Sequence, residues 1–205
     1  MGSRIMHLVI ANRIAEELSI EDKGSFLLGA IAPDAVSPKD LSHFYKGSEA
    51  DYSRAIDHQG FLEKYNNDKS MPFIQGYYTH LLADDIWLTG FYLPWLRNRM
   101  KADQDIFTRY HNDFRLLNGK LLDHYGSTQS LKEILEKPGS MTDIEEVTVK
   151  EVAAFIPYVI GDMAYEQSDI DQPLSVFTLE QIIGYVETSV ERGVACLSRM
   201  NDLKV

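Results

Sequence analysis

Apolar residues recur with a helical period along nearly the whole of this 205-residue chain. Between Gln104 and Tyr125 they are spaced three or four positions apart, which places them on one face of a helix. This apolar stripe consists of Phe107, Tyr110, Phe114, Leu117 and Leu121. No stretch alternates between apolar and polar residues in the way that a half-buried strand requires. The pattern therefore predicts an all-α fold, a single compact multi-helix bundle.

Capping residues divide the rest of the pattern into separate helices. Ser3 can cap a first helix that ends near Leu18, and a second helix is expected to begin around Glu21. The other expected helices cover residues 53–65, 72–87, 104–125, a short segment within 127–141, 142–166 and 178–200.

Prolines and glycines predict the breaks between these helices. Pro33 and Pro38 force a loop after the second helix, because the residue before each proline is pushed out of the helical region. Gly90 and Pro94 are expected to interrupt the chain after the helix that starts near residue 72, and Pro157 is expected to kink a later one. Since we find no repeat and no linker, we expect residues 1–205 to form one helical metal-binding domain.

The charge balance narrows the class of partner. Twenty basic residues against 31 acidic ones give a formal net charge of −11. Such a surface repels phosphate backbones, so we expect no duplex nucleic acid partner. No apolar stretch approaches the length of a membrane span, and early charges argue against a signal peptide, so we expect a cytoplasmic protein without stable membrane insertion. The single cysteine, Cys196, excludes an intramolecular disulfide and a cysteine-rich zinc site.

Metal-ligating residue types occur at suggestive positions in the first half of the chain. In GYYTHLLADDIW, His80 and Asp84 are four residues apart and share a helix face, so they can chelate one ion. His7 lies in the first helix, Asp34 in the proline-bounded loop, and His43 nine residues after it. Each residue alone has an ordinary structural explanation. Together they favour a multi-metal site, in which ligands converge from facing elements of a bundle.

Further polar residues in the second half are weaker candidates. His111, Arg115 and Asn118 form a polar stripe beside the apolar one. His111 could complete a metal shell and Arg115 could bind phosphate through two N–H groups, or the stripe could simply face solvent. Asp162 and Glu166 repeat the four-residue spacing and could be ligands or surface acids.

The ordered series of ligand types resembles the zinc-dependent phospholipase C family, whose relatives include the single-strand-specific zinc nucleases. The series runs through His7, GAIAPD ending at Asp34, SHF around His43, and YTHLLAD with His80 and Asp84. It covers about the first half of the chain. The resemblance implies an all-α fold with a tri-metal zinc centre that hydrolyses phosphodiesters or phosphomonoesters. It also implies that Asp34, His43, His80 and Asp84 hold one ion, with Asp84 bridging to another held by His7.

This sequence departs from the family pattern at two points. Secreted members begin with a Trp whose amine and carbonyl complete one site, whereas here the nearest counterpart is a Gly2 amine, five residues before His7. Those members also carry another His soon after the His-x-x-x-Asp motif, where this chain has TGFY at positions 89–92. We therefore expect two zinc ions, with three ions or other divalent metals as the alternatives.

These observations predict a metal-dependent phosphoesterase that attacks its substrate with a metal-activated water. Asp34 is expected to act as a base as well as a ligand, and Arg115 to bind the phosphate. The expected substrate is a small phosphate ester or a phospholipid-like molecule. The alternative is a non-catalytic binding or scaffold protein with a structural or lost metal site, which predicts a closed site. A phosphatase of the HD type is disfavoured, because no His is directly followed by Asp.

Overall fold

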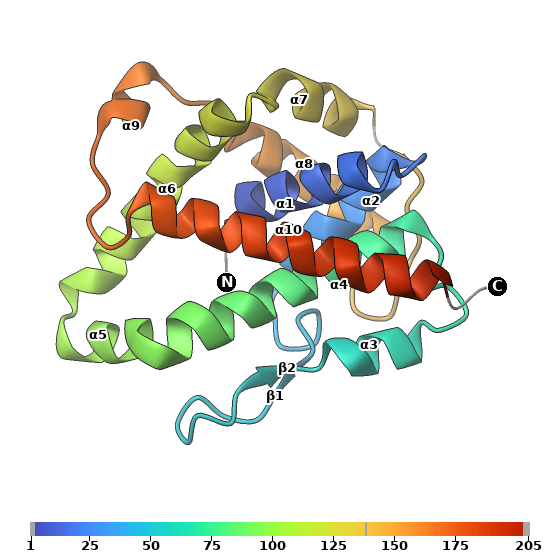
Figure 1. The fold of residues 1–205 in the computed structure, drawn as a ribbon, viewed down its shortest axis with the longest axis horizontal. Helices are drawn as coiled ribbons and strands as arrows, with labels where there is room; N and C mark the ends of the chain where they lie inside the picture. The colour runs from blue at the N-terminus through green and yellow to red at the C-terminus, as the bar shows by residue number, and fades with distance from the viewer. Residues whose placement is uncertain (1–2, 138, 203–205) are drawn as a thin grey trace.

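The computed structural model describes residues 3–137 and 139–202 and is a helical bundle (Figure 1). Helices make up 69% of the structure, which confirms the predicted all-α class. None of the described helices combines the length and apolar character needed to cross a lipid bilayer. The larger helices are α1 (Arg4–Glu17), α2 (Lys23–Ile31), α4 (Pro72–Trp87), α6 (Asp105–Tyr125), α8 (Val149–Gly161) and α10 (Leu179–Asp202).

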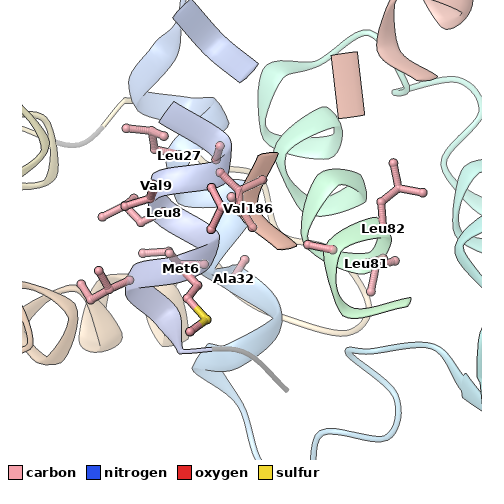
Figure 2. Packing of buried hydrophobic residues seen from close by; sticks show 14 of the residues in the cluster. Met6, Leu8, Val9, Leu27, Ala32, Leu81, Leu82 and Val186 are labelled. Carbon is pink, nitrogen blue, oxygen red and sulfur yellow. The ribbon is translucent and has the colours of Figure 1, made fainter. Parts of the chain in front are cut away.

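The helices α1, α2, α4 and α10 surround the core. As predicted, Ser3 caps α1 by accepting a hydrogen bond from the backbone N–H of Met6. Figure 2 shows Leu8 and Leu27, from α1 and α2, in the same apolar cluster as Leu81 and Val186, from α4 and α10. Residues on all sides of α1 are buried, so this helix lies inside the bundle rather than on its surface.

Two glycines allow α2 and α4 to touch through their backbones. A Cβ atom added at Gly29 would lie 2.0 Å from the carbonyl oxygen of Phe73, and one at Gly76 would lie 1.9 Å from that of Phe26. Only glycine permits so close an approach. The crossing brings the end of α2, which leads to Asp34, against the middle of α4.

The helix predicted over residues 53–65 is wrong at its start. The helix α3 spans only His58–Lys64, and Asp57 caps it by accepting a hydrogen bond from the N–H of Gly60. Residues before the cap form β2 (Ala55–Ile56), which pairs antiparallel with β1 (Tyr45–Lys46). Strands of two residues are too short to leave a visible alternation in the sequence.

The predicted interruption at Gly90 and Pro94 is also wrong. The chain continues from α4 through a π-helical segment, η2 (Leu88–Leu96), directly into α5 (Arg97–Ala102), as Figure 1 shows. Proline has no N–H to donate and its ring crowds the preceding turn, and the wider π turn accommodates both effects without ending the helix.

The second half of the chain differs from the prediction in three places. The expected helix over 142–166 begins later, because a capping box between Thr148 and Glu151 starts α8 at Val149. Two short helices are α7 (Thr128–Glu136) and α9 (Gln167–Asp171), and α9 was not predicted. Phe107, predicted to lie in the core, is 58% exposed. The helix α6 ends after Tyr125, close to the predicted end, and Gly126 follows it in the left-handed conformation.

Candidate metal centre

Five predicted ligand residues from separate elements meet in one cluster. His7 comes from the middle of α1, Asp34 from the short 3-10 helix η1 (Ala32–Ala35), His43 from the loop before β1, and His80 and Asp84 from α4. The side chains of all but Asp34 are essentially buried, and that of Asp34 is 5% exposed. Buried carboxylates and imidazoles at this density require compensating positive charge or hydrogen bonds.

Asp84 lies at the centre of the cluster, with its two oxygens facing different histidines. Its Oδ1 atom is 3.3 Å from Nε2 of His7. Its Oδ2 atom is 3.5 Å from Nε2 of His43 and 3.8 Å from Nε2 of His80. A carboxylate with its oxygens divided in this way is suited to bridge two cations.

Backbone carbonyls fix the orientation of two of the histidine rings. Nδ1 of His80 donates to the carbonyl oxygen of Ala30 at 2.7 Å, and Nδ1 of His43 donates to that of Lys39 at 3.1 Å. A carbonyl only accepts, so each Nδ1 carries a proton, and a ring that is neutral therefore has its lone pair on Nε2. These two Nε2 atoms lie 3.3 Å apart, and that of His43 is 3.6 Å from Oδ1 of Asp34.

His7 completes the cluster from the side of α1. Its ring stacks on that of His80, with centroids 3.7 Å apart and 18° between the planes. Its buried Nδ1 atom makes no hydrogen bond with any of the described residues. A buried polar atom without a partner is uncommon and calls for a ligand, a water or an ion.

The loop that carries His43 is held from two sides. The Ser42 hydroxyl donates to the carbonyl oxygen of Pro33 at 2.9 Å, and the Tyr77 hydroxyl donates to the carbonyl oxygen of Ser42 at 2.6 Å. Directly after His43, Phe44 has a φ of 51°, a left-handed conformation that is strained for a bulky side chain. Strain next to a candidate ligand is typical of a backbone fixed for function.

Burial and mutual charge divide the protonation states within the cluster. Burial lowers the pKa of His80 well below its usual value, and the neighbouring His7 lowers it further. Burial alone would raise the pKa of the Asp34 carboxyl, but its contact with the His43 side chain and the charge of Lys39 hold it well below its usual range. The pKa of the Asp84 carboxyl is also held well below its usual range. At neutral pH the cluster therefore contains two carboxylates and a neutral His80, a donor set that divalent metals prefer.

Two overlapping groups of these side chains have the spacing of metal ligands. One is His7, Asp34 and His80, the other is His43, His80 and Asp84, and the ligand atoms in each lie within 4.8 Å of one another. Since Nδ1 of His80 is bonded to a carbonyl, His80 can give only its Nε2 to one ion. The donors present therefore fit a zinc-type ion, and a second ion would depend on bridging by a carboxylate.

Asp34 connects the buried cluster to an open pocket of about 820 Å³. Lys39 lines the pocket next to Asp34, and its ammonium group forms an ion pair with the Asp34 carboxylate. The polar stripe of α6 also faces the pocket, with His111, Arg115 and Asn118 in its wall. The pocket therefore meets the cluster at Asp34, whose side chain is 5% exposed.

His111 and Arg115 line this pocket and are not part of the buried cluster. His111 is exposed, belongs to neither ligand group, and packs edge-on against Phe107 with centroids 4.5 Å apart. Arg115 donates from Nη1 to Oδ1 of Asp169 at 2.6 Å. Roles for His111 in metal binding and for Arg115 in phosphate binding remain predictions.

The predicted helix face shared by Asp162 and Glu166 is wrong. Asp162 lies at the C-cap of α8 and Glu166 at the N-cap of α9, so a turn separates them. Asp162 lines the pocket and pairs with Nε of Arg4 at 2.8 Å. The predicted role of the N-terminal amine concerns Gly2, which lies outside the described residues.

Two pocket cations were not anticipated from the sequence. Arg4 opens α1 three residues before His7, and Lys39 lies between Asp34 and His43. Their short distance from candidate ligands along the chain was the available signal.

Comparisons with family models, with curated proteins and with solved structures found no match to this chain. The resemblance to the phospholipase C family thus stays a prediction.

Proposed function

We propose that this protein is a metal-dependent hydrolase of phosphate esters. The observation that supports it best is the arrangement of acceptor atoms, since the Nε2 atoms of His43 and His80 face each other at 3.3 Å and both face Asp84. Lone pairs opposed in this way repel unless a cation lies among them. A single proton would serve one pair of atoms, whereas five convergent ligand side chains favour a metal ion.

The bridging position of Asp84 suggests how two ions would be divided. His43, His80, Asp34 and Oδ2 of Asp84 would hold the first, and His7 with Oδ1 of Asp84 would contribute to the second. Bound divalent ions supply an acidified water and neutralise the charge of a phosphate group. This division agrees with the one that the family resemblance implies.

The chain itself would position the substrate and handle the proton. Asp34 is the cluster carboxylate that reaches the pocket, which suits it to accept a proton from the attacking water. Arg115 uses one N–H group on Asp169 and keeps others for a phosphate oxygen. The aromatic side chains of Phe107 and Tyr110 would cover the remainder of a small ester.

Access to the pocket is what favours catalysis over a purely structural metal. A structural site is closed by its protein ligands, whereas a catalytic site keeps one position for water or substrate. Four of the ligand side chains here are closed off, and Asp34 opens on the pocket.

Elemental analysis of purified protein, combined with hydrolysis of bis-p-nitrophenyl phosphate and p-nitrophenyl phosphate, tests the proposal. We expect one or two zinc-type ions per chain and turnover that a chelator abolishes. His80→Ala should lose both metal and turnover. His124→Ala is the matched control, because it removes an exposed histidine of α6, away from the cluster.

The alternative outcomes are distinct. Stoichiometric metal without hydrolysis of either ester, and a melting temperature that falls on chelation, would indicate a structural metal in a binding protein. A folded chain that binds no divalent metal would overturn the proposal.

A further inference from the structure

Lys39 is placed differently from the other cations of the pocket. Arg4 pairs with Asp162 and Arg115 with Asp169, carboxylates that belong to neither ligand group. The ammonium group of Lys39 pairs with Asp34, a candidate ligand. A positive side chain thus reaches the point where the cluster opens into the pocket.

The backbone of Lys39, and not its side chain, holds the His43 loop in place. Its backbone carbonyl oxygen accepts from the backbone N–H of His43 at 3.0 Å and from the His43 ring at 3.1 Å. These bonds would survive any change beyond Cβ. The side chain is 52% exposed, so its long stem adds little to the core. The ammonium end of the pair is open to solvent, which weakens what the pair can add to stability.

We infer that Lys39 binds the phosphate group of the substrate and contacts Asp34 at the same time. This assignment rests on the proposed function and adds a catalytic residue to it. Two oxygen ligands of one tetrahedral zinc ion are near neighbours, roughly 3–3.5 Å apart. An ammonium group that touches Asp34 is therefore within reach of a phosphate oxygen held at the same centre, and its three N–H donors can serve both.

The charge of Lys39 would add to that of the bound ions in drawing an anionic substrate to an acidic protein. The chain carries a net charge of −11, and two of its carboxylates are buried in the cluster next to the pocket. A fixed cation at the mouth of the cluster offsets the repulsion of phosphate by Asp34. It would also lie beside the non-bridging phosphate oxygens, which carry the negative charge in the transition state.

The test measures zinc and phosphate separately. Zinc-loaded wild-type protein, Lys39→Met and Lys39→Arg are compared by elemental analysis and by equilibrium dialysis against radiolabelled inorganic phosphate. We expect Lys39→Met to keep the zinc content and to weaken the phosphate Kd roughly 10- to 100-fold, the effect of losing a charge-assisted hydrogen bond. Lys39→Arg should retain most of the affinity. The matched control is Lys46→Met, whose lysine pairs with Asp57 outside the pocket.

Three results would overturn the assignment. Unchanged phosphate affinity in Lys39→Met with full zinc would remove Lys39 from the substrate and leave the proposed function intact. Loss of zinc in Lys39→Met would make Lys39 a residue that only positions Asp34. Wild-type protein that binds no zinc would contradict the proposed function, and the assignment of Lys39 would fall with it.

Discussion

The candidate metal cluster and the pocket wall are adjacent, yet they are built in opposite ways. In the cluster, side chains such as His80 and Asp84 are buried, and backbone carbonyls fix the rings of His43 and His80. In the wall, Arg115 is 56% exposed and is held by a single ion pair with Asp169. The cluster has one available arrangement, while the wall side chains can move toward a ligand at small cost.

This difference suggests that the two regions have separate roles, metal binding in the cluster and substrate recognition in the wall. A metal site needs ligands held within a few tenths of an ångström, and buried rings with fixed tautomers provide that. Recognition of a phosphate ester would need a charged group that can adapt, and the exposed Arg115 provides one. Substitutions in the cluster should therefore change metal binding, and substitutions in the wall should leave metal binding unchanged.

Asp84→Asn should have the largest effect. The amide keeps the shape but removes the negative charge that faces His7, His43 and His80. We expect zinc affinity to fall by about 100-fold or more, since even outer-shell changes cost 10- to 100-fold. Turnover should disappear with the metal, and the melting temperature should no longer respond to chelator. Elemental analysis and thermal melts check this, with Asp169→Asn, which changes a carboxylate outside the cluster, as the variant that should keep its metal.

Gly29→Ala should disturb the cluster indirectly, by forcing apart the two helices that position it. The new Cβ would lie 2.0 Å from the carbonyl oxygen of Phe73, so α2 and α4 must separate. We expect the free energy of unfolding to fall by about 3 kcal/mol or more, because backbone atoms cannot move aside as side chains do. Chemical denaturation measures it. A Cβ at Gly184 in α10 meets nothing within 4 Å, so Gly184→Ala should raise stability by about 0.5–1 kcal/mol. Equal effects in both variants would contradict the close crossing.

This crossing also marks the limit of what the sequence reveals about the fold. The capped starts of α1 and α2 and the end of α6 at Gly126 follow from local rules and were predicted. The π-helical passage through Pro94 and the two-residue strands depend on tertiary contacts that no local pattern records.

The site divides in a similar way. His80 and Asp84 are neighbours on one helix, so spacing alone predicts their proximity, whereas the meeting of His7 with Asp84 depends on how α1 packs. The family-like order of ligands anticipated that meeting. It could not anticipate Lys39, because an ordinary loop lysine carries no signal until its ion pair with Asp34 is seen.

Arg115→Met should affect substrate handling without affecting the metal. Arg115 is exposed, so stability should change by no more than about 0.5 kcal/mol. If Arg115 binds the phosphate, kcat/KM should drop roughly 10- to 100-fold, as for a lost charge-assisted hydrogen bond. Steady-state kinetics at constant zinc content measure it. Arg109→Met is the matched control, since Arg109 lies on the same helix and pairs with Asp103 away from the pocket. Similar losses in both would point to net charge rather than to contact.

Asp162→Asn should have the smallest effect on stability. The direction of that effect shows whether burying this carboxylate in the pocket wall costs free energy. Burial raises the pKa of Asp162 more than the charge of Arg4 lowers it. A raised pKa in the folded protein means that ionisation of this group lowers stability as pH rises through its folded pKa. The variant should therefore be more stable than wild type at neutral pH, by a few tenths of a kcal/mol at this partial exposure. The difference should vanish as pH falls below the ordinary aspartate value near 3.8. Paired thermal melts between pH 3 and 7 measure it, and a less stable variant at neutral pH would mean that the ion pair with Arg4 outweighs burial.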